Sequence, residues 1–182
     1  MQKFKAVCAK IHLGSGNVSI GSKGDSYSMN LGKILGNLQA LEFLFRAFLV
    51  NEEIKLLSSF PQVKYLDKLK EGDIVPLNAF TNQDYLSTLI QKYNNNPKIK
   101  SSGLSIDKTL KDTRNAIIHG RVSSRELQGK LRLLQFGKPK DDQVTVTSSI
   151  LITDKWLSEQ VERIKSALLA VAEAQERLQI AS

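Results

Sequence analysis

The stretch NLGKILGNLQALEFLFRAFLV, Asn30 to Val50, sets the fold class. Its large apolar residues recur every three or four positions, as on one face of an α-helix. Asn30 is of a residue type that caps helix N-termini. The pattern therefore predicts an amphipathic helix from Asn30 to about Val50 that buries one face. The residues of that face are Leu31, Ile34, Leu35, Leu38, Leu41, Phe45 and Phe48.

Further along the chain, NQDYLSTLIQKYNNN predicts a second helix. It is expected to start at Thr81 or Asn82 and to stop before Pro97, because the residue before a proline disfavours helical backbone. A short helix is expected around Val63 to Leu69, in the loop that joins these two helices. The basic run KIKSSG that follows Pro97 is expected to be a linker.

The segment LSIDKTLKDTRNAIIHG predicts a third helix. Ser105 is a plausible N-cap and Gly120 a plausible C-terminal stop. Ile106, Leu110 and Ile117 share a face that suits a core.

After this helix the apolar pattern changes from helical spacing to alternation. LRLLQF (Leu131 to Phe136) and QVTVTSSILI (Gln143 to Ile152) are β-like, and the turn residues GKPKDD separate them, so we predict a β-hairpin. Thr153 is then expected to cap a long helix to about Leu178. Its apolar stripe, more typical of a buried bundle face than of a coiled-coil seam, is Leu157, Val161, Ile164, Leu168, Val171, Gln175 and Leu178.

These elements predict a mainly α protein. Three or four principal helices form a bundle, with one small β-hairpin, at about residues 131–152, before the long C-terminal helix. Residues 1–29 contain a run rich in glycine and serine and are expected to be an arm of loop or short strand. Residues 30–182 are expected to form the helical domain.

The composition narrows the class of protein. A chain of 182 residues with 41% hydrophobic residues suits one packed domain with an appendage. Charges interrupt every apolar stretch, and Lys10 breaks the apolar part of the start, so neither a membrane span nor a signal peptide is expected. Cys8 is the only cysteine, which excludes a disulfide framework and favours the cytoplasm.

The positive charge is concentrated in one segment. Between Lys92 and Arg132 lie ten lysines or arginines and only three acids, a net +7 of the +8 carried by the whole chain. A focused positive charge attracts polyanions such as nucleic acid. A solvated surface that aids solubility explains such a run equally well.

The basic segment surrounds the motif RNAIIHGRV, Arg114 to Val122. Arg114 and His119 are five residues apart, about 140° of rotation on a helix, so they do not share a face, although arginine is long enough to reach around. Asn115 and His119 are four apart and do share a face, so Asn115 is expected to orient the imidazole or to bind a substrate oxygen.

The residue types of this motif suit RNA cleavage without a metal. Two-metal phosphodiester chemistry needs several carboxylates, and only Asp107 and Asp112 are near, so we predict no metal site and no cofactor. RNA supplies its own nucleophile, the 2′-OH. A histidine can move a proton there, and an arginine can stabilise the charge on the phosphorane.

The sequence RNAIIH resembles the R-x4-H signature of HEPN domains, in which a polar residue often follows the arginine, as Asn115 does here. Gly120 after the histidine is also common in that family, and NLQALEFLFRAFL is similar to its first long helix. The resemblance extends from about Asn30 to Leu178, although its specific part covers only about ten residues. The hairpin looks like an elaboration of some bacterial HEPN-like proteins.

The resemblance implies a metal-independent endoribonuclease, of the kind found in toxin–antitoxin and antiviral systems. Two copies would form a homodimer in which the motifs meet in one composite site. Arg114 and His119 would be the catalytic pair and Asn115 the supporting polar residue. Around them, RNA-binding residues with no counterpart in a family motif are expected to be Arg121, Lys111, Lys108 and Arg125.

The sequence departs from one branch of the family. HEPN toxins that pair with a nucleotidyltransferase antitoxin often carry a tyrosine shortly after the histidine, where this chain has Arg121 and Val122. Regulation through such a tyrosine is therefore not expected. The partners that the resemblance implies include an antitoxin or another defence-system protein.

Two other interpretations stay open. Many HEPN domains are non-catalytic, and the chain would then be a module for RNA or nucleotide binding, or for dimerisation. In a purely structural interpretation, Arg114 would pair with Asp112 or another acid and His119 would cap its helix.

Overall fold

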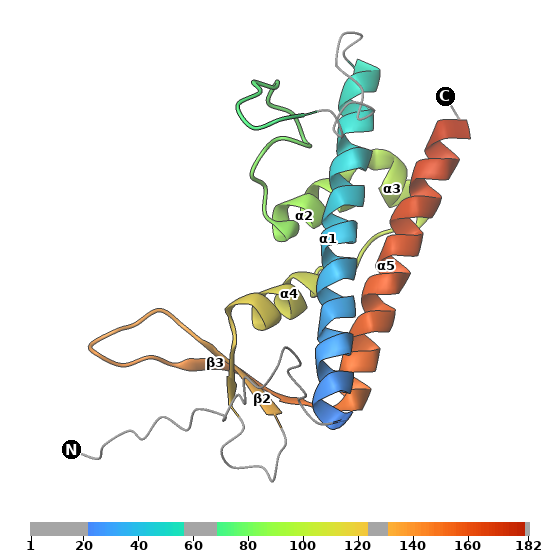
Figure 1. The fold of residues 1–182 in the computed structure, drawn as a ribbon. Coiled ribbons are helices and arrows are strands. Elements are labelled where there is room, and N and C mark those ends of the chain that lie inside the picture. Colours follow the sequence, from blue (N-terminus) through green and yellow to red (C-terminus); the bar gives the residue numbers. More distant parts are fainter. Residues whose placement is uncertain (1–21, 57–68, 124–130, 181–182) are drawn as a thin grey trace, which may run out of the picture.

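The computed structural model describes residues 22–56, 69–123 and 131–180 (Figure 1). These ranges form a mostly helical fold with a small antiparallel sheet before a long C-terminal helix. The helices are α1 (Ser22–Leu56), α2 (Leu86–Asn95), α3 (Pro97–Ser102), α4 (Leu110–His119) and α5 (Asp154–Ile180). The strands are β1 (Arg121–Ser123), β2 (Leu131–Phe136) and β3 (Val146–Ile152). No helix in the described part of the chain is long and apolar enough to cross a membrane.

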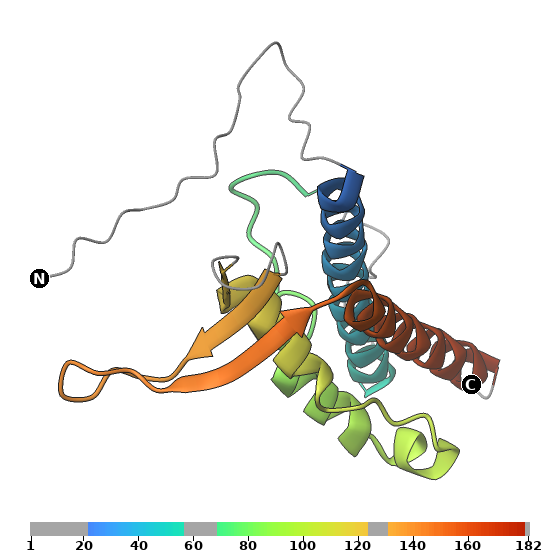
Figure 2. The ribbon, with the colours of Figure 1, turned by 90° about the horizontal axis from the view of Figure 1, so that it is seen from below.

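The long helices α1 and α5 lie side by side and run in the same direction, as the colours in Figures 1 and 2 show. The short helices α2, α3 and α4 pack along this pair, and the sheet projects from one end. The predicted stripe of α1 is confirmed, since Ile34 and Phe45 are fully buried. On α5 the predicted stripe is confirmed at Ile164 and Val171, which are likewise fully buried.

The first helix begins earlier than predicted. The structure has helix from Ser22, so Asn30 lies inside α1 rather than at its cap, and an arm that extends to residue 29 is wrong for residues 22–29. The reason is that Tyr27 packs against the core and extends the stripe by one turn, four residues before Leu31. Residues 1–21 lie outside the described part of the chain.

The second helix is shorter than predicted, and the prediction of a linker after Pro97 is wrong. α2 begins at Leu86 because Arg46 binds the carbonyl oxygens of Asn82 and Asp84, at 2.9 and 2.8 Å, and holds that backbone outside the helix. The predicted linker KIKSSG forms α3, in which Asn96 is the cap and Ile99 is buried. The predicted helix around Val63 to Leu69 falls on residues 57–68, outside the described residues, and Leu69 itself is not helical.

Helix α4 begins at Leu110, so Ser105 is not its N-cap. Buried Asn94 on α2 binds both backbone groups of Ile106, with distances of 2.8 Å to its N–H and 2.8 Å to its carbonyl oxygen. This clamp holds the preceding segment in a non-helical conformation. Leu110 and Ile106 are buried as predicted, and Ile117 packs against the same core.

The β region is a three-stranded sheet in the order β1-β2-β3 rather than a two-stranded hairpin. Strands β2 and β3 pair as predicted, although β3 begins at Val146. The additional strand β1 directly follows α4, because Gly120 has an extended backbone (φ −71°, ψ 158°) that ends the helix and starts the strand. The predicted Thr153 cap of α5 is confirmed by its side-chain bond to the N–H of Trp156.

Candidate functional site

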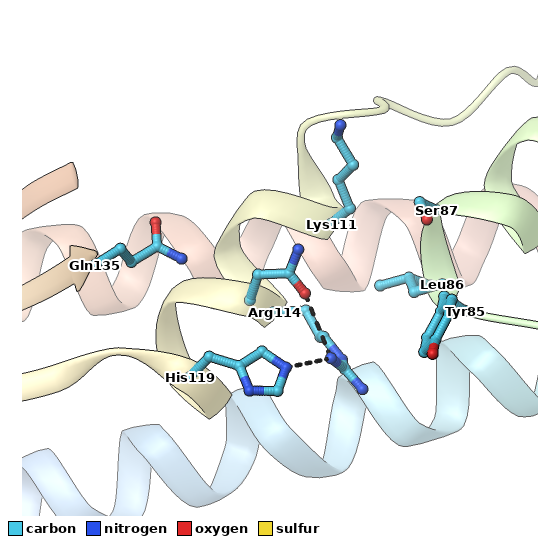
Figure 3. A pocket seen from close by; sticks show the side chains of 8 residues that line it. Tyr85, Leu86, Ser87, Lys111, Arg114, His119 and Gln135 are labelled. Atoms are coloured by element: carbon cyan, nitrogen blue, oxygen red, sulfur yellow. Dashed lines mark hydrogen bonds between the residues drawn. The ribbon is translucent and has the colours of Figure 1, made fainter. Parts of the chain in front are cut away.

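The predicted motif lies at the C-terminal half of α4, beside an open pocket of about 390 Å³ (Figure 3). Side chains from the start of α2, from α4 and from β2 meet there. The lining residues are Tyr85, Leu86, Ser87, Lys111, Arg114, Asn115, His119 and Gln135. The structure therefore brings the three predicted catalytic residues and Lys111 to one pocket.

Arg114 reaches around the helix to His119. Its Nη1 lies 3.2 Å from Nε2 of His119 (Figure 3). A guanidinium has no acceptor, so this contact is a hydrogen bond only when Nε2 accepts and the imidazole is neutral, with its proton on Nδ1. The helical separation of 140° is thus bridged within one chain, by the length of the arginine side chain.

Asn115 contacts the arginine rather than the imidazole. Its Oδ1 accepts from Nη1 of Arg114 at 3.3 Å, so the asparagine helps to orient the guanidinium. The prediction that it orients His119 through their shared face is not what the structure shows. His119 and Asn115 are both exposed, whereas Arg114 is half-buried.

The other predicted RNA-binding residues have different positions. Lys111 lines the pocket one turn before Arg114. Lys108 is exposed in the turn that precedes α4 and does not line the pocket. Arg121 lies on β1, with its guanidinium 5.2 Å from the ring centroid of Phe136, and also does not line it. Arg125 lies outside the described residues.

Sequence reasoning missed the pocket residues that come from other elements. Tyr85 and Ser87 belong to the start of α2, and Gln135 belongs to β2. In β2, Gln135 follows Leu133 by two positions and so lies on the same face of the sheet, where Leu133 is buried. The signal that could have identified Gln135 is that it is a polar residue at a position where the alternating pattern of β2 has apolar ones. The sequence contains no such signal for Tyr85, because Tyr85 comes close to α4 only when the chain folds.

A polar network fixes α4 against α5. The buried hydroxyl of Thr113 donates to Oε1 of Gln160 at 2.7 Å, and Nη1 of Arg163 donates to the same oxygen at 2.9 Å. Nη2 of Arg163 also pairs with the carboxylate of Asp107 at 2.7 Å. A backbone hydrogen bond from Thr109, followed by the contact with Arg163, lowers the pKa of Asp107 below its ordinary value. The network holds the opposite side of the helix that carries the motif.

The pocket itself is cationic. Among the described residues, its lining includes the cations Lys111 and Arg114 but no carboxylate. Across the described residues, no group of three or more His, Cys, Asp or Glu side chains is arranged to hold a metal ion. Arg114 forms no ion pair with Asp112 or any other acid within those residues, so the pairing with Asp112 that the purely structural interpretation offered is not found.

Comparison of the chain with family models, with curated proteins and with solved structures finds no match.

Proposed function

We propose that the protein is a metal-independent endoribonuclease of HEPN type that acts as a homodimer. The observation that supports this most directly is the contact between Arg114 and Nε2 of His119 in an open pocket that Lys111 also lines. A histidine and two cations lie together there, and these are groups that can move a proton and stabilise charge during cleavage at an RNA phosphodiester. The resemblance of RNAIIHG to the R-x4-H signature supports the assignment to the HEPN type.

The proposed reaction uses the RNA's own 2′-OH. Nε2 of His119 takes the 2′-OH proton as the 2′-oxygen attacks phosphorus, and the bond from phosphorus to the 5′-oxygen breaks. Arg114 leaves Nε2 for the phosphate and stabilises the charge on its oxygens, while Lys111 holds a neighbouring phosphate. In the dimer, His119 of the second copy would protonate the leaving 5′-oxygen. The products are a 2′,3′-cyclic phosphate and a 5′-hydroxyl.

Exposed apolar side chains beside the motif support a dimer at this face. Ile118 and Val122 are 48% and 51% exposed, and they flank His119 along the chain. A second copy that covered them would bring the two motifs together. We propose a toxin or an antiviral effector as the biological role, in the cytoplasm, where RNA is abundant and Cys8 stays reduced.

The direct test is RNA cleavage by the full chain in EDTA. We expect cleavage to persist, to leave a 2′,3′-cyclic phosphate, and to be lost in His119→Ala, by about 100-fold or more. The exposed position of His119 predicts an unchanged melting temperature for the variant, which circular dichroism would check. Cleavage by His119→Ala at the wild-type rate would contradict the mechanism.

The dimer is tested separately with an introduced cysteine. Ile118→Cys in a Cys8→Ser background should form a disulfide-linked dimer under mild oxidation, because the two motif faces meet in the proposed assembly. Leu169→Cys in the same background is the control, since Leu169 is exposed on α5, away from the pocket. Equal crosslinking of both variants would contradict a dimer at the motif face.

The alternative function is a non-catalytic module that binds RNA or nucleotides, or that serves dimerisation. The observation in its favour is that Arg114 is already positioned by Asn115 and His119 within one chain, so an anion can bind without a second copy. Salt-sensitive RNA binding with no turnover at any protein concentration would decide for this alternative.

A further inference from the structure

The pocket has the aromatic ring of Tyr85 at its rim, and the proposed chemistry does not use it. Tyr85 is 75% exposed, and it lines the pocket together with Lys111 and Arg114. In the view of Figure 3, the guanidinium of Arg114 lies between the rings of His119 and Tyr85. Within the described ranges, the ring of Tyr85 has no aromatic partner and its hydroxyl has no hydrogen bond.

The backbone of Tyr85 is held firmly, although its side chain is exposed. Its carbonyl oxygen accepts the N–H groups of Thr88 and Leu89, at 2.9 and 3.0 Å, as the cap of α2. On its other side, Nη2 of Arg46 binds the carbonyl oxygen of Asp84 at 2.8 Å. The side chain of Asp84 is further fixed by an ion pair with Lys92. The ring is therefore presented from an ordered backbone at little entropic cost.

An exposed aromatic ring next to cations suits an unpaired nucleotide. The ring offers a face on which a base can stack, and stacking tolerates every base because each has a π-face. A base inside a duplex already stacks on its neighbours and is not available to a side chain. A phosphate on Lys111 and Arg114 would leave the adjoining base free to reach the rim.

We propose that Tyr85 is a stacking platform for an unpaired base, so that the pocket selects single-stranded RNA. This inference rests on the proposed function only in taking RNA as the ligand, and it does not require cleavage. Arg46 is then a positioning residue, which acts through the backbone that carries Tyr85.

The experiment measures binding in a His119→Ala background, which leaves the probe intact. The probe is a short single-stranded oligoribonucleotide that carries one 2-aminopurine, compared with the same strand in a duplex. We expect Tyr85→Ala to weaken binding of the single strand by about tenfold, and to remove the fluorescence quenching that stacking causes. Tyr85→Phe, which keeps the ring, should bind and quench like the parent, and binding of the duplex should not change.

Leu169→Ala is the matched control, because it also removes an exposed apolar side chain but lies on α5, away from the pocket. It should leave both binding and quenching unchanged. Equal binding of the single strand by Tyr85→Ala and its parent would overturn the proposal, as would a Tyr85→Ala variant that changed only the dimer fraction.

The outcome is separable from that of the proposed function. If the wild type cuts RNA and Tyr85→Ala binds like its parent, stacking is overturned and the ribonuclease stands. If nothing is cut but binding of the single strand depends on the ring of Tyr85, the stacking platform stands and the ribonuclease fails. An absence of any RNA binding would overturn both.

Discussion

Helix α4 borders two pockets of about 390 Å³ each, and each contains one arginine. In the pocket toward α5, Arg163 binds the carboxylate of Asp107 and the buried side chain of Gln160, so its charge is neutralised. In the pocket toward α2 and β2, the side-chain contacts of Arg114 within the described residues are with Asn115 and His119, and none is with a carboxylate. The two pockets are thus equal in volume but opposite in chemistry. Arg163 ties α5 to the segment just before α4, whereas Arg114 has no acidic partner among the described residues.

The largest expected difference comes from removing each arginine in turn. Arg114→Ala should lower RNA cleavage by about 100- to 1000-fold with little change in stability, because in the proposed mechanism it removes a group that stabilises the transition state. Arg163→Ala should lower the free energy of unfolding by about 1–2 kcal/mol, since Asp107 and Gln160 each lose a charged hydrogen-bond donor while they keep Thr109 and Thr113 as partners. Urea unfolding and single-turnover cleavage would separate the two effects. A loss of activity in correctly folded Arg163→Ala as large as that of Arg114→Ala would break the comparison.

A smaller effect is expected where the motif meets the sheet. A Cβ at Gly120 would collide with the carbonyl oxygen of Ala116 and would lie 2.6 Å from Cδ1 of Leu133. Gly120→Ala should therefore destabilise the fold by about 1–3 kcal/mol and also lower cleavage, because the backbone must shift next to His119.

Gly36 on α1 provides the matched control for this substitution. A Cβ there meets nothing within 4 Å, so Gly36→Ala should stabilise the protein by about 0.5–1 kcal/mol. Thermal unfolding measures both variants, and a stabilising Gly120→Ala would show that this junction is not tight.

The smallest effect concerns Asp107 and its dependence on pH. Because folding lowers the pKa of this carboxyl, its contribution to stability is present above the ordinary pKa and is lost as the pH falls through the depressed value. The side chain is half-exposed, so Asp107→Asn should cost at most about 1 kcal/mol at neutral pH. Unfolding curves across acidic pH should show the difference between variant and wild type vanish at low pH. A difference that stays constant with pH would show that the charge of Asp107 is not its source.

The sequence was sufficient to predict the helices that bury a periodic apolar stripe. The cores of α1 and α5 follow from spacing alone, as Ile34 and Ile164 illustrate, because each apolar face must be buried. The motif could also be located, since Arg114, Asn115 and His119 lie on one short helix. That Lys111 would line the same pocket follows from its place one turn earlier.

What could not be predicted depends on contacts between distant segments. The hydrogen bonds of Asn94 to Ile106 set the start of α4, and the hydrogen bond of Arg46 to Asp84 sets the start of α2. Local helix propensity reveals neither of these contacts. Strand β1 was missed because three residues are too few to show alternation. Tyr85 reaches the pocket only through the packing of α2 beside α4.

The single residue between α4 and β1 has a mechanical consequence. His119 ends the helix and Arg121 begins the strand, so Gly120 is all that joins them, and it fits tightly against Leu133. Because β1 pairs with β2, the hairpin of β2 and β3 that projects from the body in Figures 1 and 2 is connected through Gly120 to the end of α4, where His119 lies. Residues 137–145 at its far end offer a handle for a probe or a crosslinker that would report on the pocket, or perturb it, from a distance.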